Sequence, residues 1–221
     1  MRHQPVYETG ASPTGEFRES VSFGATTLTS KGFQDAFVAK IDDTGDFVWA
    51  SAAGGSCSDG GLGVAAYANG TGSSIVVGYF NGSALFGSTP LLAKGGADML
   101  VAKLDGTGKV VWANSAGGNG AYVAARSVAL SPTGDVQVTG SLMGTVSFGS
   151  TTVSTGTAGH AFVAGFDSTG TPLNAVAAGG TSNSTEGQGI AVDPKGRRFV
   201  TGNFFRHHEV WSCVTDIARR Q

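Results

Sequence analysis

The chain is dominated by an internal repeat of about 62 residues. A segment that runs from Asp35 to Ala50 returns at 98–113 and, in a more divergent form, at 160–175. Glycines mark the same period, and the matching positions are Gly45, Gly108 and Gly170; Gly72, Gly134 and Gly196; and Gly78, Gly140 and Gly202. No insertion larger than one residue breaks the register between Gly15 and Gly202. Each copy is therefore expected to be a fixed structural unit that packs against its neighbours.

Four short runs rich in β-branched and aromatic residues recur in each unit and predict four strands. Examples are 189–193, 199–202, 37–41 and 47–50. The links between the first two runs and between the last two begin with Asp or Ser and end with Gly, as in 193–196 and 42–45. Such a link predicts a hairpin turn, because the first side chain bonds to the backbone and the glycine adopts a positive φ. Helical periodicity is absent from the repeats.

Four antiparallel strands per unit, stacked by contact between neighbours, are the design of a β-propeller blade. In the third strand Phe37, Ala39 and Ile41 share one face, and the small alanine permits a second sheet to approach closely. We therefore expect an all-β fold with a β-propeller-type repeat of four-stranded antiparallel blades. Another all-β repeat architecture is the alternative. Trp49 and Trp112 are expected to pack between blades, the alternative being an exposed pair that stacks on a glycan.

Several sequence blocks of the repeat occur together in one known family. The strings Gly-x-Gly-Ile-Ala-Val-Asp-x-x-Gly, Val-Thr-Gly, Asp-Ala-Phe-Val-Ala-Lys-Ile-Asp-x-x-Gly, Trp-Ala and Gly-Gly resemble the SBBP family of bacterial β-propeller repeats, over roughly 15–204. This resemblance implies a bacterial protein that is secreted or lies at the cell surface. The third copy departs most from the pattern. Its substitutions are His160 for Asp35 and Asp98, Gly165 for Lys40 and Lys103, and Asn174 for Trp49 and Trp112.

The repeat divides the chain into an unpatterned flank at 1–14, a repeat region at 15–205 and a divergent tail at 206–221. The repeat region holds about three blade-equivalents, whereas closed propellers have about four to eight blades. We therefore expect an incomplete ring, and hence a fragment of a larger propeller. The alternative is a short protein that completes its ring by self-association through open blade edges.

Composition and charge exclude several classes of function. Glycine accounts for 36 of 221 residues without a third-residue period, so the chain is not collagen-like. The net charge is −2 and there is no block of Lys or Arg, so neither nucleic acid nor an anionic membrane is an expected partner. No signal-peptide pattern or membrane-spanning stretch is present, and insertion into a membrane is not expected. Cys57 and Cys213 are too few and too far apart for a disulfide framework or a zinc pattern.

Three motifs resemble binding sites, and each has a simpler explanation. The string at 61–66 matches a dinucleotide fingerprint, but it opens a repeated strand and precedes no helix. The adjacent His207 and His208 would point to opposite faces of a strand, which suits a single metal poorly. Calcium is the one cofactor hypothesis, although its six to eight oxygen ligands exceed what one turn supplies. Its candidate ligands are Asp42 and Thr44, Asp105 and Thr107, and Asp167 and Thr169.

Catalysis needs a nucleophile with its base, or carboxylates in distinct environments. The chain has no Gly-x-Ser-x-Gly elbow, and most of its carboxylates occupy equivalent turn positions. Residues that break the repeat are better binding candidates, namely His160, Asn174 and Glu186. We expect a non-catalytic scaffold, or a segment that binds a protein or glycan ligand in adhesion. The alternative is part of a propeller hydrolase or lyase whose catalytic residues lie in other blades.

Overall fold

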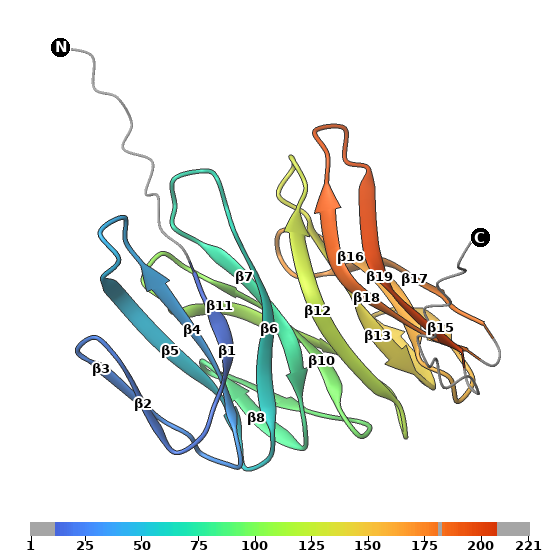
Figure 1. Ribbon diagram of the computed structural model, residues 1–221, viewed down its shortest axis with the longest axis horizontal. Coiled ribbons are helices and arrows are strands. Elements are labelled where there is room, and N and C mark those ends of the chain that lie inside the picture. Colours follow the sequence, from blue (N-terminus) through green and yellow to red (C-terminus); the bar gives the residue numbers. More distant parts are fainter. Residues whose placement is uncertain (1–11, 181–182, 207–221) are drawn as a thin grey trace, which may run out of the picture.

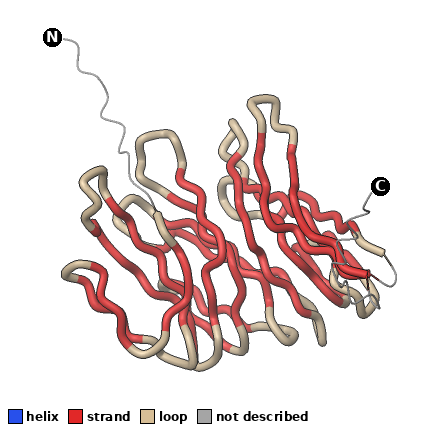
Figure 2. Tube along the Cα trace, in the orientation of Figure 1, coloured by secondary structure: helices blue, strands red, loops and turns tan. Residues whose placement is uncertain are grey.

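The computed structural model describes residues 12–180 and 183–206, and all regular structure within them is β-strand (Figures 1 and 2). The expected all-β class is confirmed. Residues 1–11 of the flank and 207–221 of the tail, with His207, His208 and Cys213, lie outside the described residues. Within the described residues no helix is long and apolar enough to span a membrane.

The strands form successive antiparallel sheets that lie side by side in chain order (Figure 1). The first sheet contains β1 (Thr14–Phe17), β4 (Asp35–Ile41) and β5 (Phe47–Gly55), and the end of β5 also pairs with β8 (Ser83–Phe86), which pairs with β9 (Thr89–Leu92). The second is β6 (Asp59–Ala66), β7 (Ser74–Phe80), β10 (Asp98–Leu104) and β11 (Val110–Ala116). The third is β12 (Tyr122–Leu130), β13 (Val136–Met143), β16 (His160–Phe166) and β17 (Pro172–Ala178), and the fourth is β18 (Asn183–Val192) and β19 (Arg198–Arg206). Within each of these sheets the strands lie in chain order.

Each unit also contains a two-stranded hairpin between its second and third strands. The hairpins are β2–β3 (Ser20–Phe23 and Thr26–Thr29), β8–β9 (Ser83–Phe86 and Thr89–Leu92) and β14–β15 (Thr145–Phe148 and Thr151–Ser154). The second and third sheets have the four antiparallel strands predicted for a unit, and the two hairpin strands of each unit were not predicted. The sequence signal for these hairpins is the recurring string Phe-Gly-x-Thr. Its glycine adopts a positive φ and begins a two-residue hairpin turn, as Gly87 does at φ 62°.

The repeated glycines occupy two kinds of position. Those at the ends of links have positive φ, with values of 92° at Gly45, 82° at Gly108, 89° at Gly170, 64° at Gly72, 87° at Gly134 and 78° at Gly196. The second kind lies in the middle of the second strand, where a Cβ would overlap a carbonyl oxygen of the first strand. The members are Gly78, Gly140 and Gly202, facing the carbonyl oxygens of Gly60, Ala124 and Glu186. Turn geometry and close backbone approach therefore account for these nine glycines.

The hydrophobic core lies between the sheets. In β10, Leu100 and Ala102 pack with Phe80 towards the first sheet, and these three side chains are at most 3% exposed. On the other face, Met99 and Val101 belong to the cluster that includes residues of the third sheet, and both are 0% exposed. Neighbouring sheets therefore cover both faces of β10.

Backbone hydrogen bonds recur between successive sheets at equivalent positions. The loop before each third strand offers a carbonyl oxygen to the first strand of the next sheet. The three bonds run from Asp59 N to Gln34 O (2.9 Å), from Val123 N to Ala97 O (3.0 Å) and from Thr185 N to Gly159 O (2.8 Å). The repeat therefore specifies how each sheet joins the next one as well as how it folds.

Candidate ligand-binding site

The link between β6 and β7 departs from the two links that are equivalent to it. In the third sheet Ser131 N bonds to Asp135 O, and in the fourth Asp193 N bonds to Arg197 O, four residues later. In the second sheet Tyr67 N bonds to Ser73 O, six residues later. The 67–73 link is thus two residues longer, and the prediction that no insertion exceeds one residue is wrong here. The regular spacing of the link glycines conceals this insertion in the sequence.

In the longer link, the first side chain, Tyr67, does not accept the hydrogen bonds that close the turn. Asp193 Oδ1 accepts bonds from Lys195 N and Arg197 N, both at 2.9 Å, so that side chain closes its own turn. Tyr67 has no carboxylate for this role, and Asn69 takes it over by accepting the amide and hydroxyl of Thr71 at 3.2 and 2.7 Å. The released ring of Tyr67 reaches the third sheet.

Two contacts hold Tyr67 in place. Its hydroxyl donates to Gly134 O at 3.2 Å, and the Lys103 Nζ lies 4.7 Å from the centre of its ring. Burial, and then the negative charge of Asp135, raise the pKa of the Tyr67 hydroxyl, so it stays a neutral donor at physiological pH. An aromatic ring and an ammonium group are thereby fixed side by side between two sheets.

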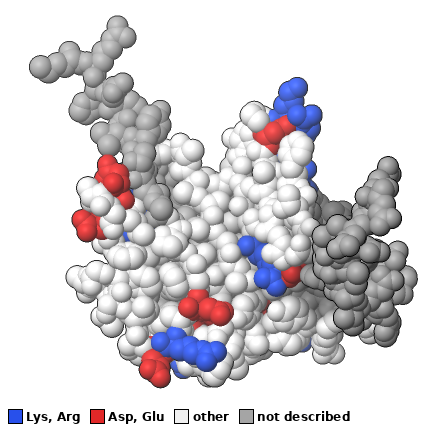
Figure 3. Space-filling view, in the orientation of Figure 1, with Lys and Arg blue, Asp and Glu red and all other residues white. Residues whose placement is uncertain are grey.

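A pocket of about 800 Å³ lies at these links. Its walls are 65–69, 130–134 and 192–194, together with Lys103 and Ser168. The three links project from the upper edge of the molecule in Figure 1, and that edge is hollowed between them in the space-filling view (Figure 3). Equivalent positions of three successive sheets thus form one site, and Tyr67 is the aromatic side chain among its walls.

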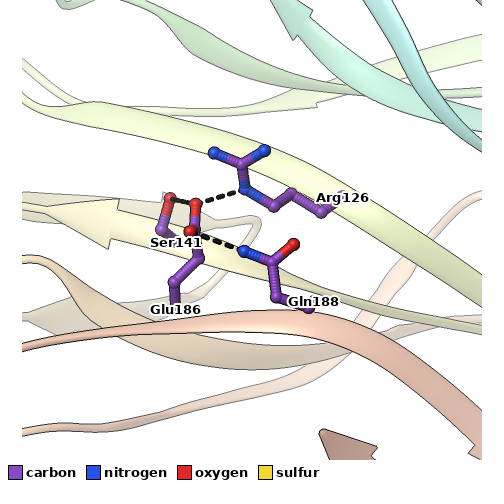
Figure 4. A network of polar contacts seen from close by, with 4 residues as sticks. All are labelled: Arg126, Ser141, Glu186 and Gln188. Atoms are coloured by element: carbon purple, nitrogen blue, oxygen red, sulfur yellow. Dashed lines mark hydrogen bonds and ion pairs between the residues drawn. The ribbon is translucent and has the colours of Figure 1, made fainter. Parts of the chain in front are cut away.

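Glu186 lies elsewhere, in a polar network between the third and fourth sheets (Figure 4). Its carboxylate pairs with Arg126 Nε, accepts Gln188 Nε2 at 2.6 Å and lies 3.5 Å from Ser141 Oγ. Arg126 and Gln188 are equivalent residues, because each lies at the register shift of its first strand. The Glu186 carboxylate is therefore already bonded to protein groups, and its contacts with Arg126 and Ser141 join the third and fourth sheets.

A related cluster that sequence reasoning missed joins the first and second sheets. Tyr79 donates its hydroxyl to Glu16 Oε2 at 2.9 Å, and Gln34 Nε2 donates to both of these oxygens. Burial, followed by the hydrogen bond and charge of Glu16, raises the pKa of Tyr79 to about 12. Tyr79 and Ser141 occupy equivalent positions next to Gly78 and Gly140. Tyr79 contacts a glutamate of the preceding sheet, whereas Ser141 contacts one of the following sheet.

His160 and Asn174, the other two predicted binding residues, also contact protein groups. His160 Nε2 lies 3.3 Å from Gly180 O, at the position where Asp98 accepts Lys94 N in the second sheet. Asn174 Oδ1 accepts Arg198 Nη1 at 3.0 Å. None of His160, Asn174 and Glu186 lines the pocket at the links.

The two repeated tryptophans lie between sheets. Trp49 Nε1 donates to Gly106 O at 3.0 Å, and Trp112 Nε1 donates to Ser168 O at 3.3 Å. The rings cover Gly108 and Gly170, where a Cβ would lie 2.6 and 2.8 Å from the indole. Each tryptophan thus covers the turn of the following unit, which is the place expected of a packing residue.

The turns proposed as calcium ligands use their carboxylates internally. Asp42 Oδ1 accepts the hydroxyl and amide of Thr44 at 2.7 and 3.0 Å and the amide of Asp46 at 2.9 Å. The Thr44 hydroxyl contributes most to lowering the pKa of the Asp42 carboxyl. Asp105 and Asp167 have equivalent partners. In the described part of the chain, no group of three or more His, Cys, Asp or Glu side chains could hold a metal ion.

Comparison with known proteins assigns no function. No protein-family model matches the chain, and no curated protein matches it either. Among solved structures, it is similar to the crystal structure of a protein of unknown function from Bacteroides caccae, at 14% identity and a TM-score of 0.28. The similarity covers 85% of this chain and 65% of that chain, so this chain spans less than two thirds of the other's length.

Proposed function

We propose that the repeated sheets are blades of a β-propeller of the SBBP type, about three blade-equivalents in number, and that they form a non-catalytic scaffold with a ligand-binding face. The order of strands within each sheet and the recurring bonds between sheets support this architecture. By the sequence resemblance, we place the protein outside the cell or at its surface.

The observation that carries the binding role is the pocket at the 67–73 link. A link that served only to join two strands would need five residues, as in 131–135 and 193–197. The longer link instead directs an aromatic ring into the space between two sheets. Loops on a rigid scaffold are the usual carriers of binding function, because they vary without disturbing the sheets.

The chemistry of the pocket favours binding over catalysis. Among its described wall residues there is neither His nor Cys. The Ser131 and Thr133 hydroxyls lie 2.8 Å apart, and Thr133 donates to Asp135 Oδ2 at 2.9 Å, so these side chains form the hydrogen bonds of their own turn. Asp193 is held by its own turn and by Arg197. These walls offer hydrogen bonds and a charge but no activated nucleophile.

A loop exchange tests this proposal. Residues 67–73 are replaced by the five-residue sequence of 131–135, which restores the common link, and binding is measured on glycan and peptide arrays. We expect the wild-type protein to bind a defined set of ligands and the exchanged variant to lose at least tenfold in affinity, with its thermal midpoint little changed. The control exchanges 42–46 for the sequence of 105–109, in a turn away from the pocket, and is expected to bind normally. Absence of ligands for the wild type, or full retention by the exchanged variant, would contradict the proposal.

A further inference from the structure

Lys103 is the cation in the wall of the pocket at the links. It lies in β10, at the repeat position that holds Lys40 in the first sheet and Gly165 in the third. Its Nζ contacts the ring of Tyr67, and among the described residues no carboxylate forms an ion pair with it. A partly buried ammonium without a paired anion is a ready partner for a carboxylate on a ligand.

Two carboxylates near the pocket are already engaged. Asp193 Oδ2 accepts Arg197 Nε at 2.6 Å, while its Oδ1 accepts two backbone amides. Asp135 Oδ2 accepts the Thr133 hydroxyl at 2.9 Å. The negative charge of Asp193 is offset by its ion pair with Arg197. Of the charged side chains in the wall, Lys103 is therefore the one whose charge is available to a ligand.

The rest of the wall suits a hydroxyl-rich molecule. Asn69, Ser131, Thr133 and Ser168 present amide and hydroxyl groups, and the Tyr67 ring lies among them. Such a mixture of short polar side chains with one aromatic ring can exchange hydrogen bonds with sugar hydroxyls and pack against the apolar face of a sugar ring. A purely apolar ligand would take these polar groups out of water without offering them hydrogen bonds.

We propose that this pocket binds an oligosaccharide that carries a carboxylate, with the sugar acid paired to Lys103 Nζ. This assignment rests on the binding function proposed above and adds the chemical class of its ligand. Lys103 distinguishes acidic from neutral sugars, while the hydroxyl and amide groups bind the features that the two kinds of sugar share.

The test compares matched pairs of oligosaccharides by calorimetry. Galacturonate, glucuronate and sialic acid oligomers are each measured against the neutral oligomer in which the carboxylate is replaced by a hydroxymethyl or amide group. We expect the wild-type protein to bind at least one acidic oligomer at least tenfold more tightly than its neutral partner, with a preference that weakens as salt is raised. Lys103→Met is expected to remove the preference, so that the acidic and the neutral oligomer bind with equal affinity. Lys40→Met, which alters the equivalent residue of the first sheet, is expected to keep the preference.

The outcomes separate the ligand class from the binding function. Equal affinity for acidic and neutral oligomers would overturn the acidic class while leaving the pocket as a sugar site. An acid preference that survives Lys103→Met would overturn the pairing of the carboxylate with Lys103. Binding of peptides alone, sensitive to the loop exchange, would overturn the carbohydrate class and keep the binding function. If no oligosaccharide and no peptide binds, both proposals fail.

Discussion

Trp112 connects the second and third sheets through one side chain. Its indole N–H donates to Ser168 O and its ring covers Gly170, so truncation removes both a hydrogen bond and apolar contact. We expect Trp112→Ala to lower the free energy of unfolding by about 2–3 kcal/mol. Denaturant titration measures this loss. Val111→Ala is the control, because Val111 is 57% exposed and should change stability by less than about 0.5 kcal/mol. Equal effects of the two changes would contradict the proposed role of Trp112.

Two aspartates should give opposite pH dependences. Burial is the main cause that raises the pKa of Asp59, so the folded state holds its proton to higher pH than the unfolded state does. The stability that this group contributes is complete below the unfolded pKa and is lost as pH rises through the folded pKa. The Asp42 pKa is lowered, so its contribution is present above the unfolded pKa and is lost as pH falls.

Unfolding curves of Asp59→Asn and Asp42→Asn between pH 3 and pH 7 test this contrast. Asp59→Asn is expected to be less destabilising at pH 7 than at pH 4. At pH 7 the wild type no longer gains the stability that the protonated Asp59 carboxyl contributes at low pH. Asp42→Asn is expected to be more destabilising at pH 7 than at pH 3. Stability differences that do not vary with pH would show that neither carboxyl changes its pKa on folding.

At the scale of elements, hairpin β14–β15 is positioned by a glycine of the preceding sheet. A Cβ on Gly118 would overlap the carbonyl oxygen of Thr145, and backbone cannot move aside as a flexible side chain can. Gly118→Ala is therefore expected to destabilise the fold by about 1–3 kcal/mol. Gly156→Ala serves as control, because a Cβ there meets no atom within 4 Å. Thermal unfolding of the two variants checks the prediction, and a neutral Gly118→Ala would mean that the hairpin does not contact the sheet closely.

Element prediction from the sequence succeeds where the residues form a repeated local pattern. The Asp42-Asp-Thr-Gly45 turn is local, since its carboxylate bonds to residues two and four positions later, and such a pattern is legible in the sequence. The hairpins were missed because each strand has only four residues, and alternate residues are half-exposed, as in β9 and β15. Short strands of that kind carry a weak periodicity signal.

At the scale of the whole molecule, stability should vary from sheet to sheet. The second sheet has covered faces on both sides, and β7 and β10 contain Ile75, Val77 and Met99 at 0% exposure. In the fourth sheet Phe199 and Phe204 are 55% and 80% exposed. We expect amides of β7 and β10 to exchange with solvent more slowly than those of β18 and β19, because opening a covered sheet costs more buried apolar area. Hydrogen exchange read by mass spectrometry checks this order, and equal protection would indicate that all sheets open together.

The sequence by itself determined the period, the turns and the all-β class. These depend on contacts within one unit, so residue types at short spacing specify them. Only the tertiary structure decided which residues meet between units, such as Tyr67 with Gly134 or Glu186 with Arg126, each pair separated by more than 59 positions. Such contacts depend on how sheets stack, and a two-residue insertion hidden by regular glycines redirects one side chain into another sheet. The candidate site depends on contacts of this kind, such as that of Tyr67 with Gly134. For that reason the sequence pointed to His160, Asn174 and Glu186 as binding residues and did not point to Tyr67 or Lys103.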